Sequence, residues 1–210
     1  GIRDTSVTGV QTCALPIYLM LLCSIRHLFN TAMKNLKQLL KIYIQKNPYE
    51  VNAIKMLNFF DNHDGCFEKD NLPGHFTGSA WVISPDKNKI LMTHHKKLNM
   101  WLQLGGHADG EKDLKSVALK EAKEESGFNN FSILSEEIFD LDIHKIEPMN
   151  EEPEHLHYDV RFLLEADPNE QDIIISEESH DVKWIHLDDV LEYNSEESIS
   201  RMVKKTKTLS

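Results

Sequence analysis

The sequence predicts an α/β protein in which helices sandwich a mixed sheet, with a helical appendage at the N-terminal side. Apolar residues recur at helical spacing in residues 27–60, short apolar runs separated by turn residues follow from residue 78, and a well-capped helix lies between Asp113 and Gly127. With 210 residues, 40% of them hydrophobic, the chain can bury one core of ordinary size. We therefore expect one main domain.

Residues 1–17 read differently from the rest of the chain. They resemble the translation of a sequencing-adapter oligonucleotide, and we interpret them as an artefact to be excluded from fold reasoning. The apolar run Ala14–Ile25 is too short to span a bilayer and lacks a basic flank and a cleavage site. We expect a cytoplasmic protein without a membrane partner, whose natural start lies near Met20 or Met33.

A helical segment is expected over residues 18–70. Its apolar residues, from Leu28 to Phe60, follow a helical period that Asn47-Pro48 interrupts, which predicts two helices joined by a short turn. An amphipathic pair of this kind packs on a core or forms a homodimer contact. We expect core packing and assign the segment no chemistry.

A β-rich domain is expected over residues 71–210. Pro73-Gly74 and Gly78 predict a loop, after which Gly78–Ser84 and Lys89–Thr93 form a hairpin through Pro85–Asn88. Further strands are predicted at Trp101–Leu104, Ile138–Ile146, His155–Leu164 and Val182–Ile185. Helices and short strands together favour a helix-covered sheet over a bundle or a barrel.

Charge and cysteine content exclude several classes. A formal net charge of −11 disfavours a nucleic-acid duplex as partner, because phosphate binding needs a basic face. A small anionic substrate is compatible if a metal ion supplies positive charge. Cys13, Cys23 and Cys66 form neither a disulfide framework nor a zinc motif.

The helix between Asp113 and Gly127 carries the main chemical signal. Asp113 is a suitable N-cap, and Gly127 is a suitable residue to end the helix. At 100° per residue, the carboxylates of Glu121, Glu124 and Glu125 fall on the stripe that buries the helix. That stripe also holds Leu114, Val117 and Ala118, whereas Lys112, Lys115, Lys120 and Lys123 fall on the solvent side.

Three carboxylates on a buried stripe need a partner. Like charges one turn apart repel, and a divalent cation reverses that cost. All-oxygen sites suit Mg²⁺ or Mn²⁺ rather than Zn²⁺. The sequence favours a metal site, and a salt-bridged surface helix is the alternative.

The run from Gly106 to Phe128 resembles the Nudix box, the signature of the Nudix hydrolase superfamily. Gly106, Glu121, Glu124, Glu125 and Gly127 match its glycines and glutamates, and the two apolar positions are filled by Ala122 and Phe128. Two positions depart from it. Lys120 replaces arginine, and Lys112 stands where the first glutamate is expected, with Glu111 one residue early.

This resemblance implies an α/β/α sandwich and hydrolysis of a phosphoanhydride bond in a nucleoside diphosphate linked to another moiety. It implies Mg²⁺, with Mn²⁺ as an alternative, bound by Glu121, Glu124, Glu125 and the Gly106 carbonyl. The general base would be Glu125, or Glu178 (or its neighbour Glu177) in the loop before the last strand. Alternative family roles are a non-catalytic nucleotide sensor and an isomerase of isoprenoid diphosphates; the absence of a cysteine near the helix disfavours the isomerase.

Three further residues are candidate contacts for a nucleotide-like substrate. His107 follows the glycine pair and is expected near phosphate. His157 shares a strand face with His155 and Asp159, which we interpret as a substrate-facing row, an exposed polar face or an extra transition-metal site. Arg161 is a candidate phosphate or base contact, or a structural ion pair, and we expect it to point away from His157.

Overall fold

The computed structural model describes residues 35–148 and 153–209. The adapter-like segment, the apolar run Ala14–Ile25, the first part of the helical segment and two of the cysteines lie outside these residues. In the described part of the chain, no helix is long and apolar enough to cross a membrane.

Within the described residues, two helices precede the sheet, as expected. Helix α2 spans Leu36–Lys46 and α3 spans Val51–Asn62, so the break falls at Asn47-Pro48. Their buried faces share one hydrophobic cluster with strand residues such as Phe76 and Tyr158. In this chain the helix pair packs on the core of the domain.

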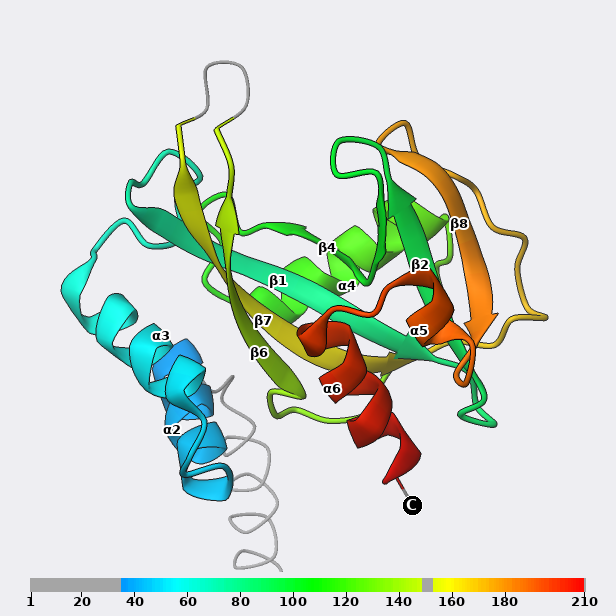
Figure 1. Ribbon diagram of the computed structural model, residues 1–210, viewed down its shortest axis with the longest axis horizontal. Coiled ribbons are helices and arrows are strands. Elements are labelled where there is room, and N and C mark those ends of the chain that lie inside the picture. The colour runs from blue at the N-terminus through cyan, green and yellow to red at the C-terminus, as the bar shows by residue number, and fades with distance from the viewer. Residues whose placement is uncertain (1–34, 149–152, 210) are drawn as a thin grey trace, which may run out of the picture. The chain divides into compact units, whose positions relative to one another are not determined.

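Eight strands form one mixed sheet (Figure 1). The strand β1 pairs antiparallel with β2 and β4 and parallel with β7, which in turn pairs with β5 and β6. The strand β2 also pairs with β3 and β8. The strands are β1 Gly74–Ile83, β2 Lys89–His95, β3 Met100–Leu102, β4 Leu104–His107, β5 Ser132–Ile133, β6 Asp140–Ile146, β7 His155–Glu165 and β8 Ser179–His186.

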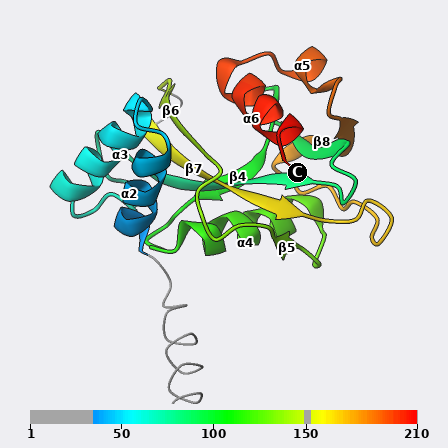
Figure 2. The same cartoon turned by 90° about the horizontal axis from the view of Figure 1, so that it is seen from below.

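Alternation along β1 separates two cores. One face carries Phe76 and Ala80 and packs against α2, α3 and α4 (Leu114–Ser126). The other carries Trp81 and packs against α6 (Glu197–Lys207), and the Trp81 indole N–H donates to Thr206 Oγ1 at 2.8 Å. Figure 2 shows α4 and α6 on opposite sides of the sheet, which is the predicted α/β/α sandwich.

Three features differ from the sequence prediction. The single strand expected at Trp101–Leu104 is divided at Gln103 into β3 and β4. The prediction of a loop that reaches Gly78 is wrong after Pro73, because β1 begins at Gly74 and runs through Gly78. A Cβ at Gly74 would lie 2.3 Å from the Leu156 carbonyl oxygen, so this glycine serves close strand pairing rather than a turn. Helices α5 (Val190–Tyr193) and α6 were not predicted.

Candidate active site

The helix α4 is placed by its ends and by close packing on the sheet. Asp113 caps the first turn by accepting from Lys115 N, and Gly127 ends the helix in the left-handed conformation with φ 74°. A Cβ at Gly78 would lie 2.5 Å from the Leu114 carbonyl oxygen, so the helix backbone approaches β1 directly. This contact sets α4 beside β4, with its glutamates near the glycine pair.

Glu125 is the most buried of the three glutamates, at 6% exposure. Its Oε1 accepts from the Gly105 backbone N–H at 3.0 Å, whereas Oε2 is buried with no hydrogen-bond partner among the described residues. Burial raises the pKa of the Glu125 carboxyl to about 8; the hydrogen bonds from Gly105 and Thr93 oppose this shift and the Glu121 charge adds to it. The ionised form of this carboxyl is therefore favoured at neutral pH only where a cation lies beside it.

Glu121 lies against the second glycine of the pair. A Cβ at Gly106 would lie 2.6 Å from the Glu121 carboxyl carbon, so only glycine leaves room for this approach. Burial is the main cause that raises the pKa of Glu121, and the charges of Glu124 and Glu178 add to it. The carboxylate and the peptide backbone of Gly106 therefore border the same small space.

Glu124 is more exposed than the helical stripe predicted. Its side chain is 58% exposed, because its position lies at the margin of the buried stripe. The Lys120 ammonium lies 3.2 Å from Glu121 Oε1 and 3.3 Å from Glu124 Oε2. The predicted solvent face also needs correction at Lys115, whose side chain is 17% exposed and pairs with Glu136.

The loop before β8 brings a fourth carboxylate to this site. The charge of Glu178 raises the pKa of both Glu121 and Glu125. Its backbone is held by the Lys96 N–H, which donates to the Glu178 carbonyl oxygen at 2.9 Å. Both Glu177 and Glu178 are exposed, but only Glu178 is among the charges that act on these two glutamates.

These residues fit a divalent cation. The fit rests on the buried Glu125 oxygen without a partner and on the space beside Gly106 that a Cβ would fill. The donor set of carboxylate and backbone oxygens suits Mg²⁺ or Mn²⁺. Glu121, Glu124 and Glu125 would hold such an ion, with the Gly106 carbonyl oxygen as a further donor.

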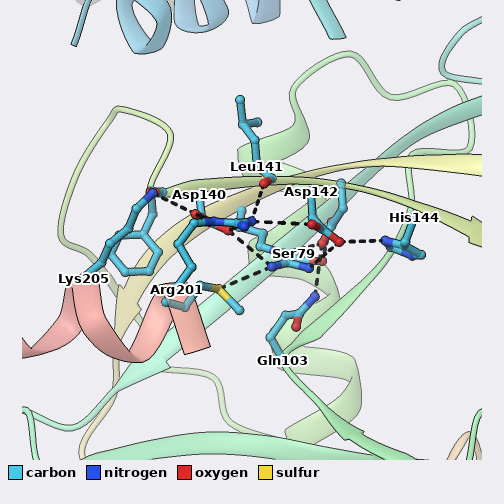
Figure 3. A network of polar contacts seen from close by, with 12 residues as sticks. Ser79, Gln103, Asp140, Leu141, Asp142, His144, Arg201 and Lys205 are labelled. Carbon is cyan, nitrogen blue, oxygen red and sulfur yellow. Dashed lines mark hydrogen bonds and ion pairs between the residues drawn. The ribbon is translucent and has the colours of Figure 1, made fainter. Parts of the chain in front are cut away.

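Arg161 lies in a buried ion-pair network rather than pointing away from His157. That expectation was wrong, because residues four apart on a strand share a face. The Arg161 guanidinium contacts Asp159 Oδ2 at 2.7 Å and Asp140 Oδ2 at 3.3 Å, and its side chain is 3% exposed. Figure 3 shows the surrounding contacts, in which Arg201 and Lys205 of α6 also pair with Asp140.

His157 lies in a cluster of five histidines at one end of the sheet. The exposed-face interpretation of its strand row is wrong, because Asp159 is 1% exposed and His155 is 8% exposed. The His157 ring lies within 5.3 Å, centroid to centroid, of each of the other members, which are His75, His107, His144 and His155. His107 thus joins this cluster one residue beyond Gly106.

Comparisons with known proteins agree with this architecture. The family model described as NUDIX domain matches residues 75–205, more than half of the chain. The chain belongs to the NUDIX domain family, and its fold and glutamate helix are those of a Nudix hydrolase. The search of curated proteins found no match.

Solved structures resemble the chain in fold at low sequence identity. An Ap4A hydrolase of C. elegans, in a binary complex, is 18% identical with a TM-score of 0.51, covering 63% of this chain and 94% of that one. A NUDIX family hydrolase from Clostridium perfringens is 22% identical with a TM-score of 0.46, covering 65% and 98%. A dihydroneopterin triphosphate pyrophosphohydrolase of E. coli is 14% identical with a TM-score of 0.49, covering 62% and 92%.

Sequence reasoning missed two members of the histidine cluster, His75 and His144, and one feature of the ion-pair network. His75 stands in the segment read as a loop, and its place beside His157 follows from the parallel pairing of β1 with β7. Arg201 and Lys205 stand on the unpredicted α6. The apolar spacing of Ile199, Met202 and Val203 was the signal that could have revealed this helix.

Proposed function

We propose that the chain hydrolyses a phosphoanhydride bond in a nucleoside diphosphate linked to another moiety, with Mg²⁺ or Mn²⁺ as cofactor. The observation that carries this proposal is the buried Glu125 Oε2 without a partner, beside Glu121 and the glycine pair. A carboxylate in that position costs stability unless a cation binds it. A surface helix held by salt bridges would leave no such oxygen.

Each residue has a distinct part in the reaction. A bound divalent cation supplies charge neutralisation at the phosphate oxygens. The cation would be bound by Glu121, Glu124 and Glu125. The Gly105 N–H donates to Glu125 and so fixes the orientation of its carboxylate. The open backbone at Gly106 lets phosphate approach without a side chain in the way.

The hydrolytic step needs a base for the attacking water. Water forms a new bond to phosphorus, the bond from phosphorus to the bridging oxygen breaks, and the bridging oxygen leaves with the electron pair. We propose that the Glu178 carboxylate is the general base that accepts the proton of the attacking water, with Glu125 as the second candidate for this role. Exposure of Glu178 keeps it accessible to water, and its charge already acts on Glu121 and Glu125.

Substrate contact is proposed for His107, which adjoins Gly106 in β4. We do not propose His157 and Arg161 as substrate contacts, because Arg161 is buried among aspartates and His157 among histidines.

The test is product release from a substrate panel at 5–10 mM Mg²⁺, an assay range that is roughly saturating for a weakly held ion. The panel contains diadenosine tetraphosphate, ADP-ribose, dihydroneopterin triphosphate and nucleoside triphosphates, together with an isoprenoid diphosphate for the isomerase alternative. Glu124→Gln should abolish turnover of whichever substrate is cleaved, while Glu170→Gln, on an exposed loop, should not. Nucleotide binding without turnover in the unmodified protein would contradict the proposal and favour a sensor, and a rearranged diphosphate without phosphate release would favour an isomerase.

A further inference from the structure

We propose that His75, His155 and His157 form a second metal site, separate from the glutamate site, that takes a transition-metal ion of the Zn²⁺ type. One ligand atom from each of the three imidazoles lies within 4.8 Å of the others, and all three side chains are buried or partly buried. The site contains nitrogen donors and no carboxylate, a set that suits Zn²⁺, Cu²⁺ or Ni²⁺ and not Mg²⁺.

The strongest observation is His75. Its side chain is 1% exposed, and within the described residues neither ring nitrogen makes a hydrogen bond of normal geometry, although the Asn71 backbone lies close enough to act on its pKa as a hydrogen-bond acceptor. A neutral imidazole always carries one donor and one acceptor, and burying either without a partner destabilises the folded protein. A metal ion at the acceptor nitrogen would satisfy the lone pair that the protein leaves without a partner.

The orientation of His155 also points its lone pair into the cluster. Its Nδ1 lies 2.8 Å from the Pro153 carbonyl oxygen, and because a carbonyl can only accept, Nδ1 carries the proton. The Nε2 of neutral His155 is then an acceptor, and it lies 3.2 Å from His157 Nε2. Backbone carbonyls that fix a histidine tautomer in this way are usual partners of metal-binding histidines.

The distances are close to those of a tetrahedral site. Nitrogen ligands at about 2.0–2.1 Å from Zn²⁺ lie about 3.3–3.4 Å apart, which the 3.2 Å separation of the His155 and His157 nitrogens nearly matches. All three ligand atoms lie within 4.8 Å of one another, so only a small approach of the rings would complete coordination by three nitrogens. A hydrogen bond between His155 and His157 alone would leave His75 without a hydrogen bond of normal geometry.

The neutral state of two of the rings and the pairing of their strands also support a metal site. Burial lowers the pKa of His75 to about 4 and that of His157 to about 2, so both rings are neutral and able to bind metal at neutral pH. His75 and His157 are opposite one another in the parallel β1–β7 pair, so the ion would join two strands that are far apart in sequence. His144, whose Nδ1 lies 3.3 Å from Asp142 Oδ2, borders the cluster, with its ring centroid 5.3 Å from that of His157.

The test is Zn²⁺ binding by the full chain after chelator treatment, measured by competition with a chromophoric chelator and by metal content after dialysis. His157→Gln should lose one equivalent of tightly bound Zn²⁺. Its Zn²⁺ affinity should fall by at least about 100-fold, which is the largest loss expected when only a residue that contacts a metal ligand is removed. His186→Gln is the matched control, because His186 is half exposed and outside the cluster. Co²⁺ in place of Zn²⁺ should give the visible absorption of a tetrahedral nitrogen site in the unmodified protein only.

Other variants separate this site from the active site. Glu121→Gln with Glu124→Gln should lose Mg²⁺-dependent turnover and keep the Zn²⁺ equivalent. If His157→Gln does not fold, His155→Gln serves instead. Unchanged Zn²⁺ binding in the histidine variants would overturn the proposal, and a higher KM in His157→Gln with Zn²⁺ binding intact would instead assign that residue to the substrate.

Discussion

The α-carbon of Gly106 faces the Glu121 carboxylate so closely that a Cβ would lie 2.6 Å from both its carbon and one of its oxygens. Gly106→Ala should therefore displace Glu121, reduce Mg²⁺ affinity and lower kcat/KM by about 10-fold or more, since a misplacement of 1 Å can cost far more than that. Gly65→Ala is the control, because its Cβ would meet only Asn71 at 3.4 Å. Equal activity in both variants would contradict the role given to this contact.

Glu125 should destabilise the metal-free protein. The pKa of the Glu125 carboxyl is raised from 4.5 to about 8. Its ionisation therefore does not reduce the free energy of unfolding below pH 4.5, and it reduces it increasingly as the pH rises toward 8. Glu125→Gln should increase the free energy of unfolding at pH 7.5 with chelator present, by on the order of 2–4 kcal/mol. Urea denaturation measures this, and a gain that does not shrink at pH 5 would point to another cause.

Glu178→Gln should lower kcat by about 10²–10⁴-fold, the usual contribution of a positioned base, with little change in KM. Glu177→Gln supplies the comparison, because it alters the same loop without altering the charge that acts on Glu121 and Glu125. Steady-state rates on the identified substrate decide between them. If Glu178→Gln keeps full activity, Glu125 becomes the assigned base.

The buried histidines should make the metal-free protein sensitive to acid. The folded pKa of His75 is about 4 and that of the unfolded histidine is about 6.5, so its stabilising contribution is present above pH 6.5 and is lost as the pH falls toward 4. His75→Gln should reduce the stability lost between pH 7 and pH 5 by about 1–2 kcal/mol. Urea midpoints at the two pH values, with chelator and with His186→Gln as control, provide the measurement.

Arg161 should be essential for stability. Removing it leaves Asp159 and Asp140, which are 2% and 0% exposed in their side chains, without the guanidinium they share. Arg161→Met should cost about 3–5 kcal/mol, as for other broken buried pairs. Lys37→Met, which breaks the exposed pair with Asp61, should cost less than about 1 kcal/mol. Similar losses in the two variants would mean that the network is not structurally important.

Local sequence signals predicted the elements of the fold, whereas the pairing of strands that are distant in sequence was seen only in the structure. The caps Asp113 and Gly127 and the break at Asn47-Pro48 are properties of neighbouring residues, so α4 and the α2–α3 turn could be predicted. The pairing of β1 with β7 joins residues about 80 positions apart, and no periodicity reports such a register. The start of β1 was missed because proline and glycine occur both in loops and in closely packed strands, and composition alone does not distinguish the two.

The candidate site divides in the same way. Helical spacing predicted that Glu121 and Glu125 lie together, and they contact the two glycines of the pair, Glu121 beside Gly106 and Glu125 bonded to the Gly105 N–H. Spacing could not tell that Glu124 is half exposed, because burial at the margin of a stripe depends on the neighbouring loop. The histidine cluster required tertiary structure, since its members come from four different strands.

The parallel pairing of β1 and β7 has a kinetic consequence. The central strand of the sheet gains this partner only after the chain has been made through Glu165, and the contacts it forms are non-local. Non-local pairing slows folding, because loop closure precedes the gain in contacts. During synthesis, the first half of the domain should therefore present an unpaired β1 edge until β7 emerges, and this interval is when the chain is most prone to aggregate.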